Sequence, residues 1–217
     1  MKRLALAAAL LAAAAGQTAA QDGPAIMDRA ARTYRALRSF SADFRQVIED
    51  SMLGTFRSRG TLVQSGPSRL SMRFSEPAGE AIVLDGRFAW VYTPSTTPGQ
   101  VLKFTIQGSP AYGLDLLSLL LDRPAERYRI SWLREEQLGG RVMDVLSMEP
   151  TDPAVPFKQA TVWLDQVDYL PRQVQVREPM RSGTRTVTFY SLRSNQRVSD
   201  RTFAFTVPPG VRVVEQR

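Results

Sequence analysis

The chain has 217 residues, and its 28 Lys and Arg against 21 Asp and Glu give a formal net charge of +7. It contains no cysteine and no histidine, which excludes disulfides, thiol catalysis, cysteine- or histidine-ligated metal sites and Ser-His-Asp chemistry. The basic residues are scattered and form no basic-aromatic cluster, so an anionic membrane surface or an acidic partner is favoured over nucleic acid.

The first twenty residues have the pattern of a secretory leader. Lys2 and Arg3 precede an apolar stretch at 4–15, and small residues (Thr18, Ala20) occupy the positions that a signal peptidase reads. The stretch is too short to span a bilayer, and no later segment approaches about 18 unbroken apolar residues. We therefore expect residues 1–20 to be a signal peptide and 21–217 to be a single exported, soluble domain without a lipid anchor. Loss of two basic residues leaves its charge at +5.

The mature chain is predicted to begin with an amphipathic helix. Apolar residues recur at helical spacing over 25–37, and Pro24 suits the first turn. Period-two alternation then predicts strands at 40–48 and 54–64. Gly60 marks a place where the second strand could bend.

Four short strands follow, with large apolar side chains at alternate positions. They are predicted at 69–75, 80–84, 88–93 and 100–106, with prolines in the turns between them. Asp85-Gly86 favours a type I′ hairpin, in which both central residues have positive φ. The side chains predicted to share one apolar face are Leu70, Met72, Phe74, Phe88, Trp90, Tyr92, Leu102 and Phe104.

The period changes at 113–121, which reads GLDLLSLLL. Leu114, Leu117 and Leu121 form one stripe, and three further leucines widen it. A helix that is apolar almost all round must be buried or lie against an apolar surface. Five more strands are predicted at 127–133, 141–149, 158–165, 170–178 and 184–193, and the C-terminal FAFTVPPGVRVVE is predicted to be extended. Close spacing and short turns indicate one antiparallel sheet of eleven strands.

An ordered set of segments resembles a known family. SFSADFRQ (39–46), residues 60–67, RLSMRFSEP (69–77), VLDGRFAWVYTP (83–94), the leucine helix and the closing segment together resemble the periplasmic outer-membrane lipoprotein carriers of the LolA type. The resemblance implies a mainly β fold: an unclosed antiparallel β-barrel of about eleven strands, with inserted α-helices forming a lid over a hydrophobic cavity. It implies a monomeric periplasmic carrier of acylated lipoproteins, loaded by an inner-membrane ABC-type release complex and unloaded to an outer-membrane acceptor. No catalytic residue, metal, cofactor or nucleic acid is implied.

The resemblance also suggests where the cavity and its latch lie. Phe44 and Leu62 of the first two strands, with Leu114, Leu117 and Leu121 of the lid, join the sheet residues above as the predicted acyl-chain lining. Family members typically carry an arginine before the proline that matches Pro67, and this arginine ties the strand to the lid. The position here is Gly66, so the predicted latch region comprises Gly66, Arg69 and Arg73.

Three other interpretations stay open. Ordinary core packing is the usual explanation of aromatic and leucine stripes such as these. The charged groups Glu80, Asp85, Asp165, Asp168, Lys103 and Lys158 are candidates for catalysis, but no base, nucleophile and orienting group occur in a recognisable order. The alternative function is a lipid-sensing regulatory or interaction module with the same half-barrel, contacting an envelope signalling protein. A module of that kind would usually bring an additional interaction domain, which favours the carrier.

Overall fold

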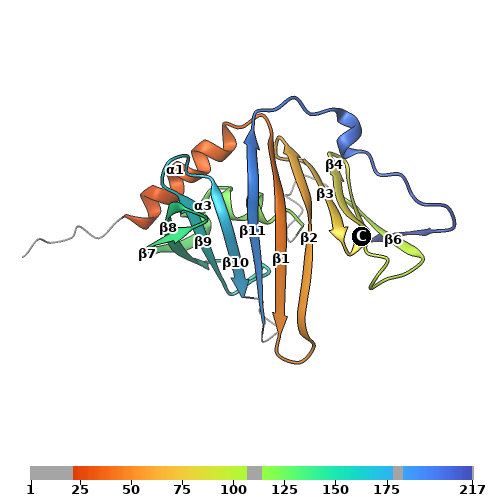
Figure 1. Cartoon of the computed structure of the whole chain (residues 1–217), viewed down its shortest axis with the longest axis horizontal. Helices are drawn as coiled ribbons and strands as arrows, with labels where there is room; N and C mark the ends of the chain where they lie inside the picture. The colour runs from red at the N-terminus through yellow and green to blue at the C-terminus, as the bar shows by residue number, and fades with distance from the viewer. Residues whose placement is uncertain (1–21, 107–113, 178–182, 217) are drawn as a thin grey trace, which may run out of the picture.

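The computed structural model describes residues 22–106, 114–177 and 183–216, so the predicted signal peptide lies outside the described residues. One twelve-stranded sheet dominates it, in the order β12-β6-β5-β4-β3-β2-β1-β11-β10-β9-β8-β7 (Figure 1). The strands are β1 (Phe40–Asp50), β2 (Gly54–Ser65), β3 (Arg69–Glu76), β4 (Ala78–Asp85), β5 (Phe88–Tyr92), β6 (Gln100–Thr105), β7 (Tyr128–Leu138), β8 (Arg141–Pro150), β9 (Gln159–Asp165), β10 (Pro171–Arg177), β11 (Gly183–Ser194) and β12 (Arg212–Gln216).

The predicted fold class is confirmed: the protein is mainly β, and its sheet curves without closing. The eleven strands predicted from alternation and turns correspond to β1–β11, which pair antiparallel. The twelfth forms beyond the Pro208-Pro209-Gly210 break, where the chain pairs parallel with β6 from Arg212↔Gln100 to Gln216↔Phe104. Two parallel strands must be joined by a long crossover connection. The prediction relies on short turns between neighbouring strands, so it cannot find this pairing.

Helices occupy the positions where the hydrophobic period changes. α1 (Gly23–Arg35) begins at the N-cap Asp22, whose side chain accepts the Ala25 N–H. α2 (Leu116–Leu121) and α3 (Pro124–Arg127) follow β6, and the 3-10 helix η1 (Asp200–Phe203) lies in the C-terminal segment. The predicted leucine helix therefore starts later than expected, at the N-cap Asp115, and Leu114 lies in the preceding turn. Its predicted first residue, Gly113, is outside the described residues.

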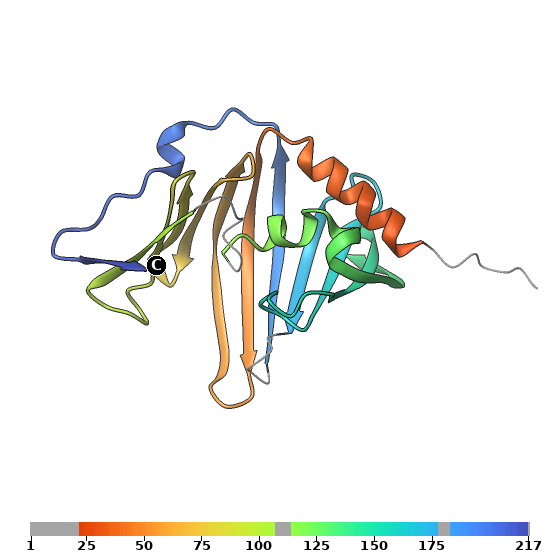
Figure 2. The same cartoon turned by 180° about the vertical axis from the view of Figure 1, so that it is seen from behind.

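The two faces of the sheet are covered by different segments. Figure 2 shows α2 lying across one face, with α1 beside it, while the C-terminal segment arches past β3 and β4 toward β6. We call the face under α1 and α2 the inner face. Its side chains form one large core cluster with leucines of α2 and with Met27, Ala30 and Ala31 of α1. The opposite, outer face of β3 and β4 lies against η1.

The pairing register places Phe88, Trp90 and Tyr92 on the outer face, so the prediction that they share a face with Leu70 is wrong. Directly opposed residues in antiparallel strands point to the same side. Trp90 is opposite Val83, and Val83 is opposite Ser71, whereas Leu70 is opposite Leu84 and, through it, Ala89. The small Ala89 and Val91 therefore face inward, and the aromatics of β5 face outward.

The C-terminal segment partly covers two of those outer aromatics. Trp90 stacks on Phe205 with ring centroids 5.6 Å apart, and Tyr92 lies 6.0 Å from the same ring. Asp85 fixes the hairpin from this side, because its carboxylate accepts the Arg87 and Phe88 N–H groups and the Trp90 indole N–H. Gly86 has φ +98°, but Asp85 has no positive φ, so the turn is not the predicted type I′.

The emission of Trp90 should report on the C-terminal segment and not on the inner face. In a variant that keeps Trp90 as its only tryptophan, with Trp132 and Trp163 replaced by Phe, a saturating acyl ligand should leave the emission unchanged. Phe205→Ala should shift it to longer wavelength, because removal of the stacked ring exposes the indole to water. A ligand-induced shift as large as the Phe205→Ala shift would contradict this placement.

Candidate functional site

The inner face gathers most of the side chains predicted to line an acyl-chain cavity. Strand register and core packing place ten of the thirteen on this face or on the leucine segment above it. The three exceptions are the aromatics of β5. The ten are Phe44, Leu62, Leu70, Met72, Phe74, Leu102, Phe104, Leu114, Leu117 and Leu121.

Gly60 allows two aromatic rings of this face to meet across an intervening strand. Gly60 of β2 is the register partner of both Phe44 and Phe74, and their ring centroids lie 5.2 Å apart, edge to face. A Cβ at Gly60 would lie 2.0 Å from the Arg73 carbonyl oxygen. The register also shifts between Arg59 and Gly60, so the bend predicted at this glycine coincides with a bulge.

Helix α2 covers this apolar surface with leucines on several sides. Leu117, Leu119, Leu120 and Leu121 are all buried, with at most 3% of each exposed. At the C-terminal end of the helix, the Tyr128 hydroxyl donates a hydrogen bond of 2.8 Å to the Leu119 carbonyl oxygen. A six-residue helix is not stable by itself in water, so packing and polar ties hold α2 in place.

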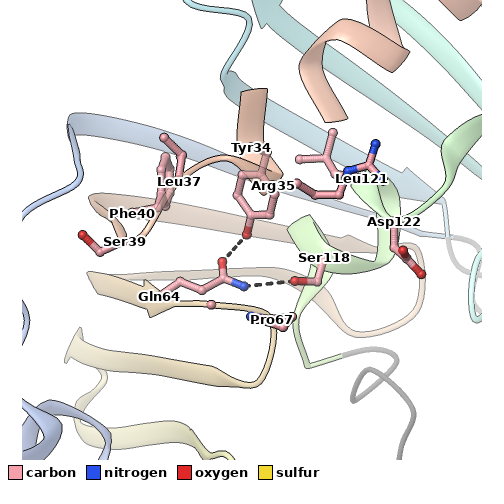
Figure 3. A pocket seen from close by; sticks show the side chains of 11 residues that line it. Tyr34, Arg35, Leu37, Ser39, Phe40, Gln64, Pro67, Ser118, Leu121 and Asp122 are labelled. Carbon is pink, nitrogen blue, oxygen red and sulfur yellow. Dashed lines mark hydrogen bonds between the residues drawn. The ribbon is translucent and has the colours of Figure 1, made fainter. Parts of the chain in front are cut away.

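A buried polar network ties the N-terminal end of α2 to α1 and β2 (Figure 3). Gln64 of β2 is 4% exposed and Asp115 is 5% exposed. The Gln64 amide donates to the Asp115 carboxylate at 2.7 Å and to the Ser118 hydroxyl at 3.0 Å, and its oxygen accepts the Tyr34 hydroxyl. Asp115 in turn accepts the Ser118 N–H as the helix N-cap. Three elements that are distant in sequence therefore meet at Gln64.

Burial raises the pKa of both acidic groups in this network. The pKa of the Asp115 carboxyl lies above its usual 3.8 because desolvation outweighs the hydrogen bonds from Ser118 and Gln64. The pKa of Tyr34 lies well above 10.0, first because of burial and second because of the nearby Asp115 charge. The network is therefore most stable when Asp115 is protonated.

The contribution of Asp115 to stability should be lost as the pH rises above about 4, the usual pKa of aspartate. The folded form holds the Asp115 proton more tightly than the unfolded chain, so this contribution is complete below the unfolded pKa and is lost through the raised folded pKa. Asp85 and Asp165, whose hydrogen bonds outweigh their burial, and Glu215, which accepts from Lys103, have lowered pKa values and act in the opposite direction, mainly below about pH 5. Urea midpoints measured from about pH 5 to about pH 7 should therefore fall for the wild type and stay flatter for Asp115→Asn. Parallel curves for the two proteins would contradict the assignment.

A cavity of about 410 Å³ lies next to the network. It lies between the end of α1, the start of β1, the β2–β3 turn and α2, and both apolar and polar side chains line it (Figure 3). Its lining residues are Tyr34, Arg35, Leu37, Ser39, Phe40, Gln64, Gly66, Pro67, Ser118, Leu121 and Asp122. The volume is within the roughly 300–1,000 Å³ of small-molecule sites.

Arg69 and Arg73 do not contact the lid, so their prediction as latch residues is wrong. Both point from β3 to the outer face, where Arg69 pairs with Asp200 at 2.6 Å and Arg73 donates to the Ala204 carbonyl oxygen at 2.9 Å. Gly66 does line the cavity opposite α2. Its φ of +64° favours glycine over any other residue at this turn. The contacts that tie strand to lid are those of Gln64.

Several of the candidate catalytic groups form ion pairs or hydrogen bonds that stabilise the fold. The Asp165 carboxylate accepts a hydrogen bond from the Val167 N–H in the same turn and forms ion pairs with Arg141 and Arg172. Lys103 pairs with Glu215 at 2.9 Å on the outer face. Among the described residues there is no group of three or more acidic side chains placed to hold a metal ion. Within the same ranges, no helix has the length and apolarity needed to cross a membrane.

Comparison with known proteins gives one family. Residues 35–206 match the family described as outer membrane lipoprotein carrier protein LolA. The outer-membrane lipoprotein carrier protein of Hahella chejuensis is 26% identical over 192 residues, which cover 88% of each chain. The protein of the same name from Shewanella loihica is 26% identical over 214 residues, covering 98% of this chain and 94% of the relative.

Solved structures share the fold at low sequence identity. An uncharacterized conserved protein from Thermus thermophilus superposes with a TM-score of 0.57 at 11% identity, over 89% of this chain and 98% of that one. MucB superposes with a TM-score of 0.51 at 18% identity, over 85% of this chain and 63% of MucB. The match to the family over most of its length shows that the chain belongs to the LolA family of outer-membrane lipoprotein carrier proteins.

Proposed function

We propose that this protein is a periplasmic carrier that shields the acyl chains of a lipoprotein between the inner and outer membranes. In this proposal residues 21–217 form a single carrier domain that takes up the chains between the inner face and α2. An inner-membrane ABC-type release complex loads it, and an outer-membrane acceptor unloads it. The carrier itself is a monomer and performs no catalysis.

The observation that carries the proposal is an apolar sheet face covered by a short leucine helix. The four buried leucines of α2 are packed against this face with at most 3% of each exposed. Because close-packed side chains leave no room for further chains, cargo can reach the inner face only if α2 moves away from it.

The energetics of release explain why an apolar helix is a suitable lid. Burying the roughly 40 methylene groups of three acyl chains at ~0.8 kcal/mol each corresponds to about 30 kcal/mol of transfer free energy. Non-covalent affinities saturate near roughly −20 kcal/mol, and a carrier must also release its cargo. Displacing Leu117 and its neighbours from the inner face offsets a large part of that gain, because their own contacts are lost when cargo binds.

A release assay tests the proposal. Inner-membrane vesicles that contain the release complex and a labelled triacylated lipoprotein are incubated with the protein and ATP, then sedimented. The label should appear in the supernatant in a one-to-one complex, measured by size exclusion with light scattering. Samples without ATP, or with a cargo whose lipidated cysteine is replaced by serine, are the controls.

Failure of the lipoprotein to leave the vesicles in the presence of the protein would disprove the carrier role. Binding of free acyl ligands without any release of lipoprotein would instead favour the alternative of a lipid-sensing regulatory module.

A further inference from the structure

The hairpin formed by β1 and β2 projects past the ends of β3 and β10 and carries exposed apolar side chains at its tip. Figures 1 and 2 show its turn extending well beyond the ends of β3 and β10. At the turn, Met52 is 92% exposed and Leu53 is 64% exposed, and the nearby Phe56 is 51% exposed. Single exposed apolar residues are common on proteins, but three at the tip of one protruding hairpin form a compact apolar surface.

Several polar groups of the tip have hydrogen-bond partners within the protein. The Asp50 carboxylate accepts the backbone N–H groups of Met52 and Leu53 at 2.9 and 3.0 Å. The other acidic side chain of the tip, Glu49, accepts the Thr184 hydroxyl at 3.1 Å. Transfer of this turn out of water therefore leaves fewer unpaired backbone groups than an ordinary turn would.

Exposed arginines lie on the hairpin strands, further from the turn than the apolar tip. Arg57, Arg59 and Arg45 are exposed on the outer face of the hairpin, where Arg57 is opposite Val47 and Arg59 is opposite Arg45. Exposed Arg177 ends the nearby strand β10. At ~3.4 Å per residue, Arg57 lies about 10 Å behind Gly54, a spacing comparable to the depth of a headgroup layer. Apolar residues that enter the interface and basic residues that contact lipid phosphates are the usual arrangement of a surface-bound protein.

We propose that this hairpin docks the protein reversibly on the surface of a bilayer that contains anionic phospholipids. Met52, Leu53 and Phe56 enter the headgroup layer, and Arg57 contacts lipid phosphates. Arg45 and Arg59 are register partners about 17 Å behind Gly54, where Arg59 pairs with Glu76 at 2.9 Å, so they only add to the positive potential behind the tip. Ile48 and Phe56 are register partners on the same face as Phe44, so a bilayer at the tip would lie at the end of the inner face. The membrane contact does not depend on the carrier role; only its use for loading cargo does.

Vesicle flotation tests the docking. Protein purified from the periplasm after export of the full chain is mixed with vesicles of phosphatidylethanolamine and phosphatidylglycerol, or of phosphatidylcholine alone. We expect binding to the anionic vesicles that weakens with added salt. Replacing Met52 and Leu53 together by Ser should lower the partition coefficient at least about tenfold, or about 1.4 kcal/mol. Arg57→Gln should lower it on anionic vesicles only.

The matched control is Val167→Ser. Val167 is 80% exposed in the turn after β9. Because β1, β11, β10 and β9 alternate in direction, this turn lies at the other end of the strands from the β1–β2 turn. Replacement of Val167 should leave vesicle binding unchanged. All three replaced apolar side chains are exposed, so unchanged melting curves should show that each variant folds.

The proposal is overturned if the wild type does not bind anionic vesicles, or if the tip variant binds them as well as the wild type does. A tip variant with normal vesicle binding that fails only in the release assay would place a protein partner at the tip, which also overturns it. Normal docking by the wild type with no release of lipoprotein would overturn the carrier role alone.

Discussion

Replacing Leu117 with Ala should lower the free energy of unfolding of the empty protein by ~2 to 5 kcal/mol, as for other buried leucines. Leu117 is 3% exposed at the centre of the lid, and truncation leaves a space that neighbouring leucines fill only in part. The same change should preserve or tighten acyl binding, because the closed empty state is what the cargo displaces. Urea unfolding and titration with a fluorescent fatty acid measure the two effects.

Leu146→Ala is the matched control for the lid. Leu146 is fully buried in β8 and belongs to the same core cluster, but it is part of the sheet. Its truncation should cost a similar amount of stability without tightening acyl binding. If Leu117→Ala lowers stability and acyl affinity together, then α2 is an ordinary core helix and not a lid.

Gln64→Leu should be comparably destabilising, by about 2 to 4 kcal/mol, because it leaves the buried Asp115 carboxylate without its amide donor. It also removes the hydrogen bonds from Gln64 to Ser118 and from Tyr34 to Gln64. Since these contacts tie α2 to β2 and α1, fatty-acid uptake in stopped-flow experiments should be faster than in the wild type.

Two comparisons isolate the network. Gln46→Leu makes the same replacement in β1. The Gln46 amide donates to the Ser58 hydroxyl at 3.1 Å. Because this hydrogen bond does not involve α2, its loss should change uptake little. Adding Asp115→Asn to Gln64→Leu should recover part of the lost stability, because the unpartnered group is then neutral. No recovery in the double variant would show that the stability lost in Gln64→Leu comes from packing and not from the buried carboxylate.

Alternation within single strands is enough to predict the sheet. Leu70, Met72 and Phe74 face one side of β3, as a period of two requires, and turn signals separate the eleven antiparallel strands. Alternation cannot decide which side of the next strand shares that face, because a shift of one residue reverses every side chain. Of the two alternating sets of side chains in β5, the aromatic set is bulkier and is therefore predicted to face inward. In the structure Ala89 and Val91 face inward instead. The aromatic pair Phe203 and Phe205 near the C-terminus is the signal that the outer face also needs a cover.

The latch illustrates a second limit of the sequence. A buried Gln64 in a strand pattern looks like any exposed polar residue, and its partners are 30 to 54 positions away. Only the N-cap pattern can be found locally, since Asp115 precedes Ser118 by three residues at the start of the leucine run. The arginine expected from the family directs attention to Arg69 and Arg73, whose side chains point to the other face.

The C-terminal segment has a mechanical consequence for cargo exchange. Strands β3–β6 have apolar side chains on both faces. Phe205 packs on Trp90 and Tyr92 of the outer face, and β12 pairs with the edge of β6. If α2 leaves the inner face as the proposed carrier role requires, this half of the sheet keeps its outer packing and the strand paired with β6. The C-terminal segment would then brace β3–β6 from outside and preserve the curvature of the sheet while cargo enters and leaves.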